Sequence, residues 1–216
     1  MKYKILPLVA FISINVSAQT AKQVYKRTSS IEKASNTVTL YFSGSNSRVE
    51  MTDTSIQFPN GNLPTTDIIK NGTSSVVYSL NVKDKTYTTH VSGTNLGYDN
   101  HAVSLKIIGK EKIGKYNCIH SQITQGTTIN DYWTTKEIPD YDVYKKTSTG
   151  NTKFMRDASE QAEMVKNNVD GCIIKATTLG EPGGITITTE LILFEQKELP
   201  ASLFEVPADY KLVQRK

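Results

Sequence analysis

The segment TVTLYFSGSNSRVEMT, residues 37–52, decides the fold class of this chain. Every second residue in its first half is apolar, the chain turns at Gly44-Ser45-Asn46, and the alternation resumes in the second half. The apolar positions are Val38, Leu40, Phe42, Val49 and Met51. Because successive side chains of a strand point to opposite faces of a sheet, this pattern predicts a β-hairpin with one apolar face.

The same kind of pattern extends along most of the chain, which is rich in threonine and tyrosine, residues that favour strands. Residues 75–91 predict a second hairpin that turns at residues 82–85. Residues 104–124 predict a long pair of strands, broken at Gly109 and at Gly114-Lys115. Further strands are expected at residues 67–70, 129–134, 172–178 and 185–196. The sequence therefore predicts a mainly β protein of the α+β class, with one domain built on an antiparallel sheet.

Helical signals are few. Residues 153–167 predict one amphipathic helix, which ends before Gly171. Its apolar residues, spaced four and three apart, are Phe154, Ala158, Ala162 and Val165. Glu160 and Glu163 are expected on the other faces of this helix, and a short helical turn is expected at residues 199–204.

Residues 1–18 have the three parts of a secretory signal: two lysines, an apolar run, and the small pair Ser17-Ala18. Cleavage is expected after Ala18, which leaves residues 19–216 as a single domain. The apolar run is shorter than the roughly 20 residues that cross a bilayer, so no permanent membrane anchor is expected. No cysteine follows the cleavage point, so the lipid-attachment signal of bacterial lipoproteins is absent. We expect the chain in the periplasm, with the extracellular medium as the alternative.

Charge and composition narrow the range of partners. Without its leader the chain has 23 basic residues against 21 acidic ones, and the lysines are scattered among acidic residues. Nucleic-acid binding proteins concentrate positive charge on one face, so no nucleic-acid partner is expected.

The two cysteines, Cys118 and Cys172, permit two interpretations. An oxidising periplasm favours a disulfide bridge between them. Free cysteine is also among the most frequently buried residue types, so both could be small apolar residues on different strands. The sequence leaves both alternatives open.

No residue pattern in the chain predicts catalysis or a cofactor. His90, His101 and His120 lack the close spacing of a zinc site, and Cys118 beside His120 is a weak nucleophile candidate in the middle of a strand. Nucleophile elbows and phosphate-binding loops are absent. We therefore expect no catalytic residue, no metal site, no cofactor and no enzymatic activity.

Residues 131–141 form a dense aromatic cluster around Trp133 that leads into a proline-bounded segment. Such clusters either fill a core or line a pocket. Residues 137–144 are expected to form an acidic, aromatic loop.

Three stretches carry a resemblance to a known family: Tyr116-Asn117-Cys118 after residues 113–115, residues 132–139, and Leu199-Pro200 leading to residues 204–210. With them the chain resembles, over most of residues 22–212, a family of exported bacterial proteins with a domain of unknown function. This family is grouped with the LolA and LolB type of periplasmic lipoprotein carrier. The resemblance implies a strongly curved antiparallel half-barrel with one or two helices across its concave face. In the carriers such a fold encloses an apolar cavity for acyl chains.

Two functions remain open at this stage. The first is a soluble periplasmic carrier for a lipid or a lipoprotein acyl chain. Its candidate ligand-binding residues, each of which could instead belong to an ordinary core, are Leu40, Phe42, Met51, Tyr78, Leu105, Ile107, Trp133 and Leu193. The second is a structural or interaction protein of the cell envelope, with a filled core and an envelope protein as partner.

Overall fold

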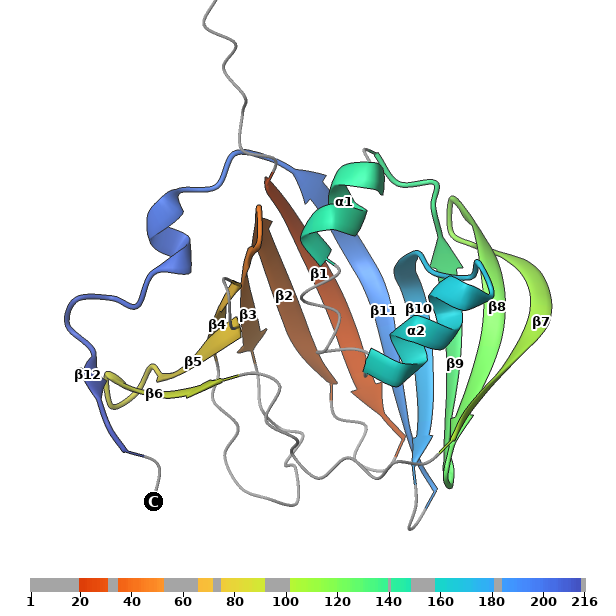
Figure 1. Ribbon diagram of the computed structural model, residues 1–216, viewed down its shortest axis with the longest axis horizontal. Coiled ribbons are helices and arrows are strands. Elements are labelled where there is room, and N and C mark those ends of the chain that lie inside the picture. Colours follow the sequence, from red (N-terminus) through yellow and green to blue (C-terminus); the bar gives the residue numbers. More distant parts are fainter. Residues whose placement is uncertain are drawn as a thin grey trace, which may run out of the picture.

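Twelve strands form one curved sheet in the computed structural model of the protein (Figure 1). The strand order is β12-β6-β5-β4-β3-β2-β1-β11-β10-β9-β8-β7, and every neighbouring pair is antiparallel except β12 with β6, which is parallel. The structure describes residues 20–30, 35–52, 66–71, 75–91, 102–139, 141–148, 158–180 and 184–214. The predicted antiparallel, mainly β fold is confirmed, and the predicted leader lies outside the described residues.

The elements agree closely with the predicted strands and hairpins. The strands are β1 Thr20–Ser29, β2 Ser35–Ser43, β3 Asn46–Thr52, β4 Thr66–Asn71, β5 Ser75–Asn81, β6 Thr86–Val91, β7 Val103–Ile113, β8 Tyr116–Gln125, β9 Thr128–Thr135, β10 Cys172–Gly180, β11 Ile185–Gln196 and β12 Lys211–Leu212. The helices are α1 Tyr141–Ser148, α2 Ala158–Lys166 and the 3-10 turn η2 Ala201–Phe204. The predicted helical turn near residue 200 is thus confirmed.

Two-residue loops set the register of two hairpins. Ser43 pairs with Asn46 around Gly44-Ser45, and Ile113 pairs with Tyr116 around Gly114-Lys115. Both glycines have φ near +57°, a conformation that glycine adopts without a steric penalty. A glycine at the first loop position matches the right-handed twist of the flanking strands.

Strand β1 is the longest of the elements that the sequence pattern did not predict. It lies at the middle of the sheet, between β2 and β11. Its residues on the face shared with Leu40 are Ala21, Gln23, Tyr25 and Arg27. Because Gln23 and Arg27 are polar, this face of the strand has no run of apolar residues at alternate positions.

Both α-helices pack against the same face of the sheet (Figure 1). Met164 of α2 contacts residues of β8, β9 and β10 in one buried cluster, and α2 also contacts β7 at the sheet edge. A single helix can reach four strands in this way because the sheet curves around it, so the helices lie on the concave face.

For α2, the prediction of which residues face the sheet is wrong. Ala162 and Val165 are exposed, whereas Glu160 and Met164 are buried against the sheet. The reason is a polar contact, since the Glu160 carboxylate accepts hydrogen bonds from the Asn130 amide and the Tyr132 hydroxyl, at 2.6 and 3.0 Å. The predicted residues 153–157 lie outside the described part of the chain.

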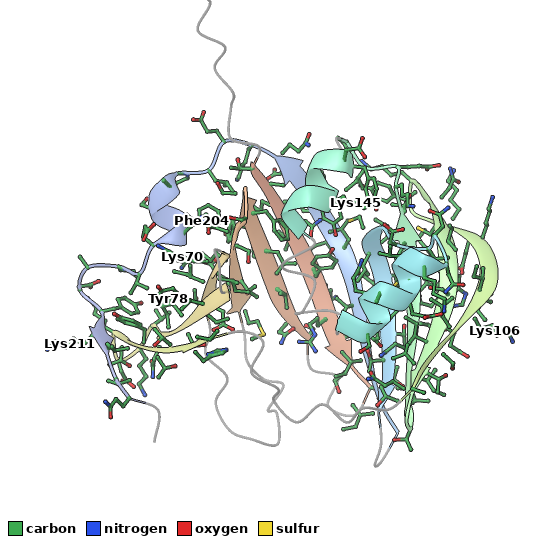
Figure 2. All side chains as sticks on the ribbon, viewed as in Figure 1. Lys70, Tyr78, Lys106, Lys145, Phe204 and Lys211 are labelled. Carbon is green, nitrogen blue, oxygen red and sulfur yellow. The ribbon has the colours of Figure 1, made fainter. Side chains whose placement is uncertain are left out.

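The C-terminal segment covers the convex face of β3 and β4. Phe204 of η2 is buried there, and the Arg48 guanidinium donates to the Leu203 carbonyl oxygen at 3.1 Å. Figure 2 shows Phe204, Lys70 and Tyr78 at this end of the molecule, where Lys70 pairs with Glu205. The segment therefore shields a second apolar layer, on the face opposite the helices.

At Gly171 the backbone lies so close to the backbone of Thr135 that a side chain would not fit. A Cβ atom at this position would lie 2.8 Å from the backbone oxygen of Thr135. We predict that Gly171→Ala lowers the free energy of unfolding by about 1–3 kcal/mol, as overpacking does in other proteins. Urea denaturation checks this prediction, with Gly109→Ala as the control because its Cβ would meet no atom within 4 Å. Equal stability of the two variants would show that the contact is unimportant.

Candidate apolar ligand site

The concave face of β1 to β3 carries a continuous set of apolar side chains, which we call the apolar wall. Strand register places Val38 between Tyr25 and Met51, and Leu40 between Gln23 and Val49. The apolar wall consists of Tyr25, Val38, Leu40, Phe42, Val49 and Met51. These side chains are 1–9% exposed. Three strands thus present one apolar surface toward the helices.

Helix α1 lies over one end of the apolar wall and contacts it through Tyr144. The Tyr144 ring meets Phe42 of β2 and Phe194 of β11 edge to face, each with ring centroids 6.4 Å apart. Edge-to-face pairs are a favoured aromatic geometry, so these contacts hold α1 on the sheet. The expectation of a loop at residues 137–144 is therefore wrong from Tyr141 onward.

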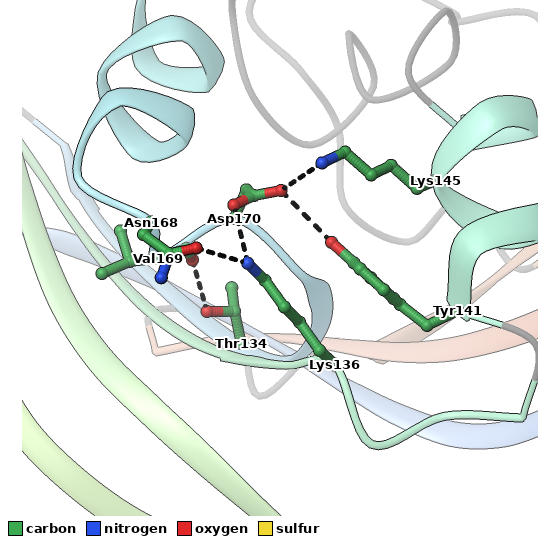
Figure 3. Close-up of polar contacts among 7 residues, drawn as sticks. All are labelled: Thr134, Lys136, Tyr141, Lys145, Asn168, Val169 and Asp170. Atoms are coloured by element: carbon green, nitrogen blue, oxygen red, sulfur yellow. Dashed lines mark hydrogen bonds and ion pairs between the residues drawn. The ribbon is translucent and has the colours of Figure 1, made fainter.

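A buried carboxylate connects α1 to the segment that follows α2 (Figure 3). Asp170 is 6% exposed and accepts a hydrogen bond from the Tyr141 hydroxyl at 3.2 Å. The ammonium groups of Lys136 and Lys145 lie 3.1 and 3.5 Å from its oxygens. We call Asp170, Lys136, Tyr141 and Lys145 the Asp170 cluster.

Burial of the Asp170 carboxyl group disfavours its charged form. The hydrogen bond and charge of Lys136, with smaller contributions from Lys145 and Tyr141, outweigh that effect and hold the Asp170 pKa below the ordinary value of 3.8. Asp170 is therefore ionised at neutral pH and attracts both lysines.

A Schellman motif at the end of α2 positions Asp170. The Val169 N–H donates to the Met164 carbonyl oxygen at 3.0 Å, and the Asn168 N–H donates to the Val165 carbonyl oxygen at 3.1 Å. Asn168 has φ +55°, the left-handed conformation that this motif requires. The chain then passes directly into the Asp170 cluster.

The structure brings only some of the predicted ligand-binding residues together. Leu40, Phe42 and Met51 belong to the apolar wall, and Leu105 packs near α2. Tyr78 does not belong to the apolar wall, and its ring contacts that of Tyr87 on the neighbouring strand β6. The remaining three do not belong to the apolar wall. Ile107 is 51% exposed, Leu193 is 38% exposed, and Trp133 is part of a different buried cluster.

Trp133 is not part of the apolar wall, and it lies on the face of β9 opposite that of Tyr132, which packs with Met164 of α2. Its indole stacks on the His120 ring with centroids 4.1 Å apart, and the Lys175 ammonium lies 4.8 Å from the indole ring centroid. The indole N–H donates to the Glu111 carboxylate at 2.6 Å, and His120 contacts Asp131 at 2.9 Å. Trp133 also belongs to a buried apolar cluster with Cys118, Ile138, Tyr144, Cys172 and Ile174, which is distinct from the apolar wall.

The two cysteines are free and buried. Cys172 pairs with Thr135 of β9, and the register of β8 with β9 places Cys118 on the other side of Thr135. One strand thus separates the two cysteines, so their Cα atoms lie about 10 Å apart. A disulfide needs Cα atoms within about 7 Å, so the bridged alternative does not fit this geometry.

Burial raises the pKa of the Cys118 thiol to about 11, so this group is protonated at neutral pH and is a poor nucleophile. The Cys172 sulfur accepts a hydrogen bond from the Gln23 amide at 3.5 Å. Within the described ranges, His, Cys, Asp and Glu side chains form no group of three that could hold a metal ion. In the same ranges, no helix is long and apolar enough to cross a bilayer.

A family described as a domain of unknown function (DUF4412) matches residues 25–210. The chain belongs to this family. The expectation of a family of unknown function is thus confirmed. None of the curated proteins matches the sequence of this DUF4412 chain.

Solved structures similar to this DUF4412 chain include PNGF-II, with a TM-score of 0.51, 13% identity, and coverage of 92% of this chain and 31% of that one. The chain thus spans about a third of PNGF-II, and this likeness shows the fold alone. MucB in complex with MucA has a TM-score of 0.42 at 8% identity, covering 92% of this chain and 58% of that one. A LolA superfamily protein from Nitrosomonas europaea has a TM-score of 0.35 at 7% identity, covering 87% and 90%.

We predict that Asp170→Asn lowers the free energy of unfolding by about 1–3 kcal/mol at pH 7, because it weakens charge-assisted hydrogen bonds. The Asp170 pKa is lowered in the folded state, so the stabilisation is complete above about pH 5 and is lost as the pH falls through the unfolded-state and then the folded-state pKa. Urea unfolding at pH 7 and at pH 3 measures both effects. Glu198→Gln, at an exposed position, is the control. A deficit that persists unchanged into acid would contradict the assignment.

We also predict that the chain, unfolded in denaturant without reductant, contains two reactive thiols per molecule. In the folded protein both thiols should react slowly with a thiol reagent at pH 7, because they are buried and the Cys118 pKa is raised. Thiol titration followed by mass spectrometry makes this measurement. A complete absence of thiols in denaturant would instead establish a disulfide.

Proposed function

We propose that the protein is a soluble periplasmic carrier that binds one apolar chain, such as the acyl chain of a lipid or lipoprotein, between the apolar wall and α1. The observation that carries this proposal is the apolar wall itself, which spans three strands and faces a short, separately attached helix. The proposed compartment rests on the leader that residues 1–18 predict.

The energetics suit an acyl ligand. Burying one methylene group contributes about 0.8 kcal/mol, so burying about ten of them contributes roughly 8 kcal/mol before the costs of immobilisation. A net binding free energy of that size corresponds to a micromolar dissociation constant. The ligand must displace whatever covers the wall, so measured affinity also depends on the cost of opening the site.

Helix α1 is the element best suited to open the site. It has eight residues, and helices of that length have little stability alone in water. Its attachment depends on the Tyr144 ring contacts and on the Asp170 cluster, in which Lys145 is half exposed. A lid held mainly by side-chain contacts can move without disturbing the sheet.

We propose binding rather than catalysis. The one nucleophile candidate from the sequence, Cys118, has a thiol pKa raised to about 11. Its neighbour His120 is engaged with Trp133 and Asp131. These contacts suit a structural role for both residues.

One observation favours a second function, a structural or interaction protein of the envelope with a filled core. The apolar wall is almost completely covered, as it would be in a protein that binds nothing there. The test of the carrier proposal must therefore separate a closed lid from a filled core.

The test begins with protein purified from its native envelope, analysed by native mass spectrometry and lipid extraction, followed by uptake of a fluorescent fatty acid. We expect Asp170→Asn to accelerate uptake by loosening α1, and Phe42→Ala to weaken binding about tenfold by removing part of the wall. Ile192→Ala, at an exposed position on β11, should leave both unchanged.

Protein that arrives without lipid and takes up no fatty acid, in wild-type and Asp170→Asn forms alike, would refute the carrier proposal and favour the filled core. Circular dichroism of each variant establishes that it is folded before uptake is measured.

A further inference from the structure

The two ends of the sheet differ. One end is β12, a strand of two residues, and the other is β7, with 11 residues from Val103 to Ile113. In the part of the chain that the structure describes, β7 pairs with β8 alone. An edge strand directs alternate backbone N–H and C=O groups away from its neighbour, so β7 presents a long row of hydrogen-bonding groups.

Two apolar side chains lie in the middle of this edge. Ile107 is 51% exposed and Ile108 is 45% exposed, at a bulge between Ile107 and Gly109. Bulges and lysines are common devices that keep an edge strand from aggregating. Neither device explains two adjacent exposed isoleucines, which make an apolar contact available to an incoming strand.

The charge of this edge is positive. Lys106, Lys110 and Lys112 are exposed, and Figure 2 shows Lys106 at the outer rim of the sheet. Glu111 accepts the indole N–H of Trp133, so its carboxylate is engaged. Acidic residues on an incoming strand would therefore meet lysines on β7.

A second copy of this chain fits the edge poorly. Two β7 strands paired antiparallel about Ile108 would place Lys106 opposite Lys110 of the other copy. Like charges directly opposite each other destabilise strand pairing. The charge pattern thus favours a partner of opposite sign.

We propose that the β7 edge binds an extended acidic segment of a partner polypeptide by strand addition, with Ile107 and Ile108 as the apolar contact and Lys106 and Lys110 as the charge contact. This interaction surface is separate from the apolar wall, so it does not depend on the carrier proposal.

The test uses a fluorescein-labelled peptide of alternating glutamate and valine with the full-length protein, measured by fluorescence anisotropy. We expect saturable binding and slower amide hydrogen exchange in β7. Lys106→Glu combined with Lys110→Glu should weaken binding by about tenfold or more, because it replaces attraction with repulsion. The control is Lys83→Glu, an exposed lysine in the turn between β5 and β6.

A peptide with methylated central amide nitrogens separates strand addition from simple charge attraction, and it needs no protein variant. Loss of binding by this peptide supports strand addition. Equal binding of the methylated peptide, equal binding to the charge-reversed variant, or dimerisation of the protein through β7 in sedimentation would each overturn the proposal.

Discussion

The pairing of β1 with β11 is the constraint on which the rest of the structure depends. Strands β1 to β6 and strands β7 to β11 are two series in which neighbours in sequence are neighbours in space. In the described ranges the only strand pairing between these two series is that of β1 with β11. The Tyr25 hydroxyl of β1 also donates to the Ile173 carbonyl oxygen of β10, across β11, at 3.1 Å. One strand pair, with this side-chain contact, therefore makes two smaller sheets into one.

The candidate site is a product of that junction. The apolar wall belongs to the first series, whereas α1, α2 and the Asp170 cluster follow strands of the second. Tyr144 reaches Phe42 because β11 carries Phe194 to the position beside Gln23 of β1. Neither series alone has both a wall and a lid. A change that shifts the register of β1 against β11 would move the lid relative to the wall.

The sequence predicts those parts of the fold that depend on local pattern. The hairpin of β2 and β3 is readable because apolar alternation and Gly44 coincide. Strand β1 is not readable, because its concave positions include Gln23, which is buried and bonded to the distant Cys172. Its place in the sheet is set by residues far along the chain, and a sequence pattern within ten residues cannot predict those partners.

Much of the candidate site is hidden from sequence for the same reason. Leu40, Phe42 and Met51 follow from alternation, but Asp170 is buried beside lysines from two other segments of the chain, which no local pattern predicts. The inward face of α2 is set by the carboxylate of Glu160, which helical hydropathy assigns to solvent. The sequence predicts a loop at residues 137–144, whereas α1 begins at Tyr141. Tyr141 and Tyr144 are three residues apart, and two positions are too few to establish a helical period.

The position of β1 in the sheet has a consequence for how the chain folds. Ala21 pairs with Gln196, so β1, the first described strand, can complete its pairing only after β11 has been synthesised. Contacts so distant in sequence form slowly, because closing a long loop costs conformational entropy before any contact compensates for it. A chain that emerges from its N-terminus can assemble β1 to β6 early, yet one side of β1 stays open until β11 arrives.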